Sequence, residues 1–534
     1  MSEPTTSSLA FLVLGAPIAF VAVAAVAAMA RTEQGLRPQR VERMGIWAAW
    51  GGVVVAVASA AIVAFGGAVE SPTIGISNLG LSIRLDALST IMITMIALLG
   101  VVIFRYSVTY LDGDPRQGVF LGRLALTLAA VEVLVTAGNL AVLLAAWIGT
   151  SLALHRLLVF YPERRRATIA ARKKFLVARI GDVFLVVATL LLFKKFGTGN
   201  LEAIFEAARQ VGRGSWSFGA LEAAAVCLCF AALLKSAQFP THGWLVEVME
   251  TPTPVSALLH AGILNAGPFL AIRMAFVIDD APPARTLLIA VGGFTALFGS
   301  VVLLTQPSVK AGLAYSSVAH MGFMLMVCGM GAYPAALLHL VAHSFYKAHA
   351  FLSSGSVIDE VRADKVSLPA RLGSPIRIAT SGGIALGLYF ALAALWRVNP
   401  VSDPVVFAIG AILVLGTSQI IAPALDSEGG LAGTVRAGLL AAGVTTSFFA
   451  LESGVHHLLR STVPDGAAAD LVQLAVIAAT VTAFTAVVLL QILEPSRAPS
   501  RRRRALAIHL RNGLYANALL DRAVGALHTK GAAR

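Results

Sequence analysis

The feature that most constrains this chain is a series of apolar runs, each about 20 residues long, that recur along almost its whole length. An α-helix of about 20 apolar residues crosses a hydrocarbon core of about 30 Å. Of the 534 residues, 57% are hydrophobic and only 13% are charged, whereas a soluble globular domain has roughly 25% charged residues. We therefore predict an all-α, polytopic membrane protein with about 15 transmembrane helices.

The first apolar run has no basic segment before it and no convincing cleavage site after it. We therefore interpret it as a membrane span and not as a cleavable signal peptide. The expected spans cover residues 9–30, 45–68, 86–104, 121–137, 139–160, 175–193, 219–235, 253–277, 286–305, 311–331, 333–356, 376–396, 404–422, 432–451 and 470–493.

Basic residues are distributed unevenly among the loops between these runs. They gather after the first, fifth and eleventh spans and in the tail at 501–504, and the loop after the fifth span is expected to include Lys173 and Lys174. The exceptions on the other side are Lys194, Lys195, Arg209 and Arg213. The positive-inside rule predicts that the N-terminus is outside and the C-terminus is in the cytoplasm of a bacterial inner membrane. Topology thus accounts for the net charge of +13, and nucleic-acid binding is not expected.

The basic tail, residues 494–534, has an apolar periodicity of its own. Leu506, Leu510 and Leu514 recur at helical spacing, which predicts an amphipathic cytoplasmic helix. Such a helix can lie on the lipid surface or dock a cytoplasmic partner, and both alternatives remain open.

Lys235 and His260 lie in the most unusual segment of the chain, where ionisable residues interrupt the apolar pattern. Pro240 follows Lys235 closely and should break the helix, because proline lacks a backbone donor. Transporters place ion sites at such breaks, and a lysine at such a site can gain and lose a proton. We predict a proton relay through Lys235 and His260. The alternatives are a Lys235 that snorkels to a headgroup and a His260 that is satisfied within the core.

A second ionisable group consists of His339, His343 and Lys347, which are spaced i, i+4 and i+8. On a helix they form one polar stripe that rises about 12 Å, and His320 lies in the preceding span. Histidine titrates near neutral pH and can pass a proton between its two nitrogens, so we predict a proton wire. The alternative is a metal site, but no nearby carboxylate or cysteine would complete it and Lys347 would repel a cation. The three cysteines form no CxxC pair.

Two carboxylates also lie within apolar runs. Asp182 follows Arg179 by three residues, and we expect the two to form a salt bridge. Glu132 has no partner in its own helix and either balances Lys235, relays a proton, or pairs with Arg123.

Three long segments carry a family resemblance: KSAQFPTHGWLVEVMETPTPVSALLHAG, TQPSVKAGLAYSSVAHMGF and HLVAHSFYKAHAFLSSGSV. They closely resemble the antiporter-like membrane subunits shared by respiratory complex I (its L, M and N subunits), Mrp antiporters and membrane-bound hydrogenases. RLDALSTIMI and RYSVTYLDGDP resemble the L-type branch. In that family the matching residues are proposed to carry protons, which implies this role for Lys235, His260, His339, His343 and Lys347.

The resemblance also implies a fold of inverted five-helix repeats with broken helices. The repeats would occupy residues 121–277 and 286–422, with N-terminal helices in 1–120 and two C-terminal helices in 432–493. One departure concerns the fifth span, where the family has Trp-Glu-Gly and this chain has Trp147-Ile148-Gly149. Isoleucine cannot ionise, so either pumping is lost or another carboxylate replaces the glutamate, with Glu132 as the leading candidate.

THGWLVEVMETPTPVSALLHAG and RNGLYANALLDR look most like membrane subunits of DAB inorganic-carbon pumps (DabB). That resemblance implies a membrane subunit that conducts protons or sodium ions and works with a large, carbonic-anhydrase-like zinc partner (DabA-like) in the cytoplasm. Hydration of CO2 would occur on the partner, so neither enzyme activity nor a cofactor is expected on this chain. The alternatives are a proton-pumping L-type subunit of a quinone dehydrogenase, a cation/proton antiporter subunit, and a membrane scaffold. The dehydrogenase subunit should have the fifth-span glutamate and a long lateral helix.

Overall fold

The structure is a computed structural model that describes residues 8–29, 38–76, 79–210, 219–355, 375–396, isolated positions between 409 and 421, 430–493 and 501–525. The expected span at 404–422 lies largely outside the described residues. Within them, 11 helices are long and apolar enough to cross a membrane, and the shorter apolar helix 380–395 adds to these. The protein is therefore an all-α, polytopic membrane protein, as the sequence predicts.

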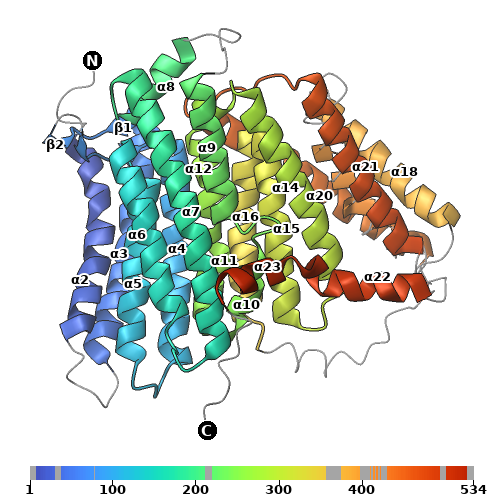
Figure 1. Cartoon of the computed structure of the whole chain (residues 1–534). Helices are drawn as coiled ribbons and strands as arrows, with labels where there is room; N and C mark the ends of the chain where they lie inside the picture. Colours follow the sequence, from blue (N-terminus) through green and yellow to red (C-terminus); the bar gives the residue numbers. More distant parts are fainter. Residues whose placement is uncertain are drawn as a thin grey trace.

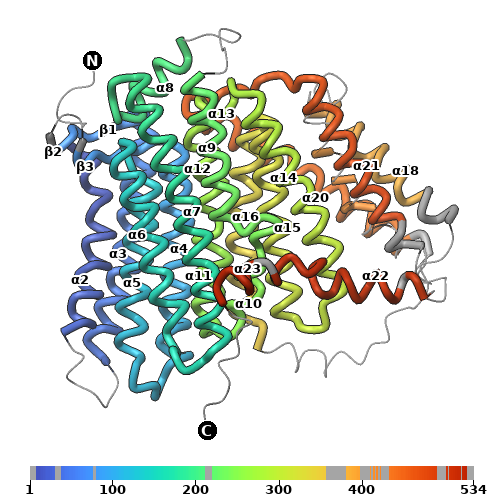
Figure 2. The backbone as a smooth tube through the Cα atoms, in the orientation of Figure 1, coloured from blue at the N-terminus to red at the C-terminus, as the bar shows by residue number. Residues whose placement is uncertain are grey.

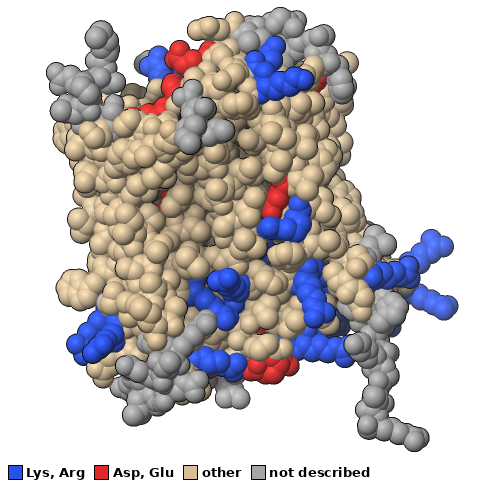
Figure 3. Space-filling view, turned by 60° about the vertical axis from the view of Figure 1, so that its left-hand side comes forward, with Lys and Arg blue, Asp and Glu red and all other residues tan. Residues whose placement is uncertain are grey.

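Most of the helices run side by side in one bundle (Figure 1). On the face that Figure 3 shows, a broad band has few charged side chains, and Lys and Arg are more numerous in the lower half of that view. The elements up to the last long helix are η1 (Ala10–Leu14), α2 (Gly15–Met29), α3 (Gln39–Gly66), α4 (Ala87–Tyr110), α5 (Gln117–Val135), α6 (Leu140–Leu158), α7 (Arg165–Phe196), α8 (Leu201–Gln210), α9 (Ala220–Lys235), α10 (Gly243–Glu247), η3 (Val248–Glu250), α11 (Thr253–Ala261), η4 (Ile263–Asn265), α12 (Ala266–Arg273), α13 (Ala275–Ile278), α14 (Pro282–Leu303), α15 (Val309–Gly329), α16 (Tyr333–Leu352), α18 (Pro375–Leu395), α20 (Gly430–Leu459) and α21 (Leu471–Leu493).

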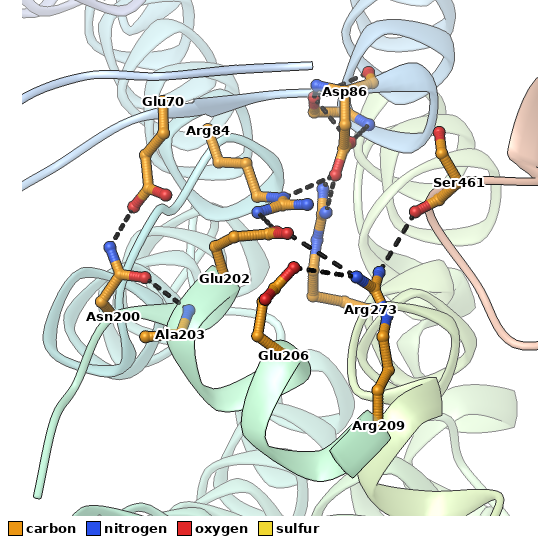
Figure 4. Close-up of polar contacts among 11 residues, drawn as sticks. Glu70, Arg84, Asp86, Asn200, Glu202, Ala203, Glu206, Arg209, Arg273 and Ser461 are labelled. Atoms are coloured by element: carbon orange, nitrogen blue, oxygen red, sulfur yellow. Dashed lines mark hydrogen bonds and ion pairs between the residues drawn. The ribbon is translucent and has the colours of Figure 1, made fainter. Parts of the chain in front are cut away.

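Two short β-ribbons occupy the connection between α3 and α4. Antiparallel β1 (Val69–Glu70) and β4 (Arg84–Leu85) pair with Glu70 opposite Arg84, and β2 (Ile74–Ile76) pairs with β3 (Leu79–Leu81). Asp86 follows β4 directly, caps α4 and forms ion pairs with Arg84 and Arg273 (Figure 4). Because Arg273 ends α12, this buried cluster joins the ribbons to the broken helices. We refer to this end of the bundle as the hairpin end and to the opposite end as the α10 end.

The tail differs from the single amphipathic helix that the periodicity predicts. It forms α22 (Arg501–Arg511), η6 (Gly513–Tyr515) and α23 (Asn517–Ala523), with a kink where Gly513 has φ +58°. The prediction was wrong because glycine readily adopts this left-handed backbone conformation and ends the helix. Figure 2 shows α22 passing across α14 and α15 and α23 reaching α10.

The three tail leucines consequently have different surroundings. Leu510 packs against a small apolar cluster that includes Phe298 and Tyr315, whereas Leu506 and Leu514 are exposed. The tail is thus held against its own chain, and two of its leucines remain available to lipid or to another protein.

Candidate functional site

The first break in a membrane helix lies directly after Lys235. As predicted, the helix stops short of Pro240: α9 ends at Lys235, Ala237 has φ 51°, and α10 begins only at Gly243. A positive φ is unusual for alanine and takes the backbone out of the helical path. The break therefore places the Lys235 side chain at a helix end inside the bundle, and the residue is only 7% exposed.

Lys235 contacts α6 at Trp147, the residue before Ile148. Its Nζ donates to the Trp147 carbonyl at 3.1 Å and lies 4.3 Å from the centre of the Trp147 ring. Asp182 on α7 pairs with Arg179 at 2.7 Å, as predicted, and also acts electrostatically on Lys235. Asp182 is thus the carboxylate that the structure brings to Lys235.

Glu132 lies in a different part of the bundle. It is 2% exposed, and both carboxylate oxygens lack a hydrogen-bond partner among the described residues. Its Oε1 faces Gly52 on α3, where an added Cβ would be 3.7 Å away. The structure therefore places Glu132 toward the N-terminal helices and brings no contact between it and Lys235.

A second break, which the sequence did not predict, interrupts the expected span 253–277. There α11, η4, α12 and α13 replace one continuous helix. Pro268 has no N–H to donate to the Leu264 carbonyl, and this carbonyl instead accepts from Ser236 Oγ at 3.0 Å. The two breaks therefore meet directly.

Asn265 extends this junction toward the second ionisable group. Its Nδ2 donates to the Ala261 carbonyl at 2.8 Å and to Ser344 Oγ at 2.7 Å. Ser344 lies on α16 between His343 and Lys347. Polar groups of the broken helices thus lead from Lys235 to α16.

The structure brings the predicted histidines together with Lys347. His260 Nδ1 is 2.8 Å from Ser317 Oγ, and its ring stacks on Phe351. Further contacts include His320 Nδ1 to His339 Nε2 at 2.9 Å, the His320 and His343 rings at 5.2 Å, and Lys347 Nζ to the Leu313 carbonyl at 3.1 Å. His260 and Lys347 are 0% exposed and His343 is 3% exposed. Among the described residues, no three His, Cys, Asp or Glu side chains have an arrangement that could hold a metal ion.

Two lysines lie within α7 and not in a loop, so the prediction for them was wrong. Lys173 and Lys174 were expected in a loop, but α7 begins at Arg165 and the two residues are 0% and 4% exposed. Hydropathy placed the start of the span after them because consecutive basic residues lower the local average. Ser236, Asn265 and Ser317 were also missed, and the Asn-Ala-Gly-Pro sequence at 265–268 was the available signal for the second break.

Comparisons with known proteins agree with this architecture. Residues 137–379 match the family described as NADH:quinone oxidoreductase/Mrp antiporter, TM, and residues 73–121 match the N-terminus of complex I chain 5. The chain is 38% identical to the probable inorganic carbon transporter subunit DabB2 of Halothiobacillus neapolitanus, over 84% of this chain and 81% of that protein. It is 33% identical to NADH-quinone oxidoreductase subunit L of Mycobacterium tuberculosis, over 68% of this chain and 56% of subunit L. A chain of the Mrp complex from Dietzia sp. has a TM-score of 0.61 at 25% identity, with 97% of this chain and 60% of that chain covered.

Proposed function

This chain belongs to the family of ion-translocating, antiporter-like membrane subunits that includes inorganic carbon transporter subunits DabB, and on that premise we propose that it is the ion-conducting subunit of an inorganic-carbon accumulation complex. In this proposal, protons or sodium ions flow down their gradient through the chain. That flow drives CO2 or bicarbonate accumulation by the complex in the bacterial inner membrane, with the α10 end toward the cytoplasm.

The observation that carries the proposal is a line of buried basic groups that joins the two broken helices to α16. It starts at Lys235, passes the Ser236–Leu264 junction and Asn265, and continues to Lys347 and the histidines. Burial of cationic groups in a membrane bundle is costly, so their retention indicates that charge moves past them. Asp182 provides the counter-charge that the family places at the position of Ile148. A membrane scaffold would need none of these groups.

We further propose that a zinc-containing, carbonic-anhydrase-like protein binds at the α10 end and hydrates CO2. The similarity to DabB2, which is named as a subunit of a probable inorganic carbon transporter, supports assembly with partner subunits. The exposed side chains of Leu506 and Leu514, beside the basic residues of α22, provide an apolar and cationic surface for it or for anionic lipid.

A second candidate function is a proton-pumping subunit of a quinone dehydrogenase, which the 33% identity to subunit L favours. Against it stands Ile148, at the position where such a subunit is expected to have a glutamate. Affinity purification from the native membrane separates the two candidates. We expect recovery of a large zinc protein, and recovery of a quinone-reducing complex would instead establish the second function.

The ion-conducting role is tested by Lys235→Ala, with Lys195→Ala on the exposed end of α7 as the matched control. We expect Lys235→Ala to leave expression and assembly intact and to abolish inorganic-carbon uptake, whereas the control retains it. Normal uptake by assembled Lys235→Ala would refute the proposed relay.

A further inference from the structure

Lys174 is a buried lysine that neither break accounts for. It lies on α7, is 4% exposed, and its Nζ donates to the carbonyl and the hydroxyl of Ser151, both at 2.8 Å. Among the described residues no carboxylate bonds to it. Burial of an ammonium group without a bonded counter-ion costs several kcal/mol, so packing alone favours an apolar residue at this position.

The preceding residue shows what a structural lysine looks like in the same helix. Lys173 Nζ pairs with Glu247 at 2.7 Å and with Asp521 at 2.5 Å, and it donates to Asn517 Oδ1 at 3.1 Å. It therefore joins α7, α10 and α23. Lys173 and Lys174 are neighbours in the sequence, but only Lys173 is paired with carboxylates, those of Glu247 and Asp521.

The bonding partner of Lys174 lies one helical turn from that of Lys235. Trp147 and Ser151 are at i and i+4 on α6, so the two acceptor carbonyls are roughly 6 Å apart along the helix. His155 follows at the next turn, near the α10 end of α6, where it is half-buried and acts electrostatically with Lys174. One face of α6 thus presents Trp147, Ser151 and His155 in a line, and the two lysines bond to the first two of these residues.

Lys174 and Lys235 share one nearby carboxylate, that of Asp182. The charged groups that act on Lys174 are Lys235, Arg179 and Asp182. Together with Lys174 itself, three cations therefore lie near one anion, Asp182. Ile148 adds no negative charge. Because like charges in a buried site disfavour each other, the ammonium form of one lysine opposes the ammonium form of the other.

We propose that Lys174 is a further proton-carrying residue, which connects Lys235 to the α10 end of the bundle by way of His155. The inference rests on the proposed function and deepens it. The neutral amine of Lys174 takes a proton from the His155 imidazolium or from water. The resulting ammonium then gives that proton to the neutral amine of Lys235, through water or a shift of the flexible lysine chain. Asp182 stays ionised throughout, and the total charge of the two lysines is the same before and after their exchange.

Arginine and glutamine variants separate proton transfer from a structural role. Arginine keeps the charge but does not release a proton in proteins, so we expect both Lys174→Arg and Lys174→Gln to reduce proton flux roughly 100-fold, the contribution of a positioned proton carrier. At Lys173, where only pairing is needed, Lys173→Arg should retain more flux than Lys173→Gln. Flux is measured with a pH-sensitive dye in liposomes that contain the full-length chain with its co-purified partners.

His155→Phe provides a test that leaves Lys174 in place. It keeps an aromatic ring beside Phe175, which is 5.2 Å from the histidine ring, and should lower the flux and change its dependence on the pH at the α10 end. Wild-type flux in Lys174→Arg, or in His155→Phe if the lysine variants do not fold, would overturn this inference. If those variants keep wild-type flux but Lys235→Ala loses it, only the role of Lys174 is refuted and the proposed function stands. If Lys235→Ala also keeps its flux, the proposed function itself is refuted.

Discussion

The close approach of α9 and α12 at Gly267 leads to a specific prediction for Gly267→Ala. An added Cβ would lie 2.0 Å from Ser236 Oγ and 2.4 Å from the Ala232 carbonyl oxygen. The serine side chain can rotate, but the carbonyl belongs to the α9 backbone. To reach an ordinary contact of 3.4 Å, α9 and α12 must separate by about 1 Å (3.4 minus 2.4). Overpacking of this kind costs about 1–3 kcal/mol, and the shift also displaces Lys235 at the end of α9.

The assay compares thermal unfolding in detergent and ion flux in liposomes. Gly149→Ala is the matched control, because no atom lies within 4 Å of its added Cβ and alanine gains about 0.5–1 kcal/mol in a helix interior. We expect a lower unfolding midpoint and reduced flux for Gly267→Ala, and neither effect for the control. Ser236→Ala in the same chain should restore stability only in part, because the carbonyl contact remains. Wild-type stability and flux in Gly267→Ala would refute this reasoning, and full rescue by Ser236→Ala would show that the backbone contact is not limiting.

Three further predictions concern the two ends of the bundle. Burial alone would raise the pKa of Asp86, but the charges of Arg273 and Arg84 outweigh burial and hold this pKa well below its usual range. Asp86→Asn should therefore lower the free energy of unfolding by about 3–5 kcal/mol. Chemical unfolding measures this loss, and an unchanged midpoint would contradict the prediction. Burial raises the pKa of Glu70 from 4.5 to about 7, so between these pH values the folded state binds more protons than the unfolded state. The free energy of unfolding should therefore fall as the pH rises from about 4.5 to 7. Glu70→Gln should lose this pH dependence in thermal unfolding. Asp521→Ala removes one of the two carboxylates that pair with Lys173 and should make the tail more sensitive to trypsin, and an unchanged cleavage rate would show that α23 is held by other contacts.

The proposal for Lys174 gives a physical reason why this chain can differ from the family at Ile148. With a glutamate there, Lys235 would have two nearby carboxylates. Here it shares Asp182 with Arg179 and Lys174, so the balance between the two lysines determines which of them is charged. Both the wild-type arrangement and an Ile148→Glu variant can be compared in the flux assay.

The sequence by itself determined the class of fold and much of the ion-conducting region. Long apolar runs predict membrane helices because the hydrocarbon core requires every backbone polar group to be satisfied within the span. Pro240 predicted the break after Lys235 because a missing donor is a local property of the chain. The i, i+4, i+8 spacing of His339, His343 and Lys347 likewise fixes one face of a helix before any packing is known.

Only the tertiary structure decided which of these groups meet. Sequence favoured Glu132 as the replacement carboxylate, but Lys235 faces α6 and α7, where it finds Asp182. Lys173 and Lys174 looked like loop residues, yet one pairs with the tail and the other bonds to Ser151 inside the bundle. Hydropathy and spacing describe one helix at a time, whereas the partner of a buried charge depends on which faces of distant helices pack together.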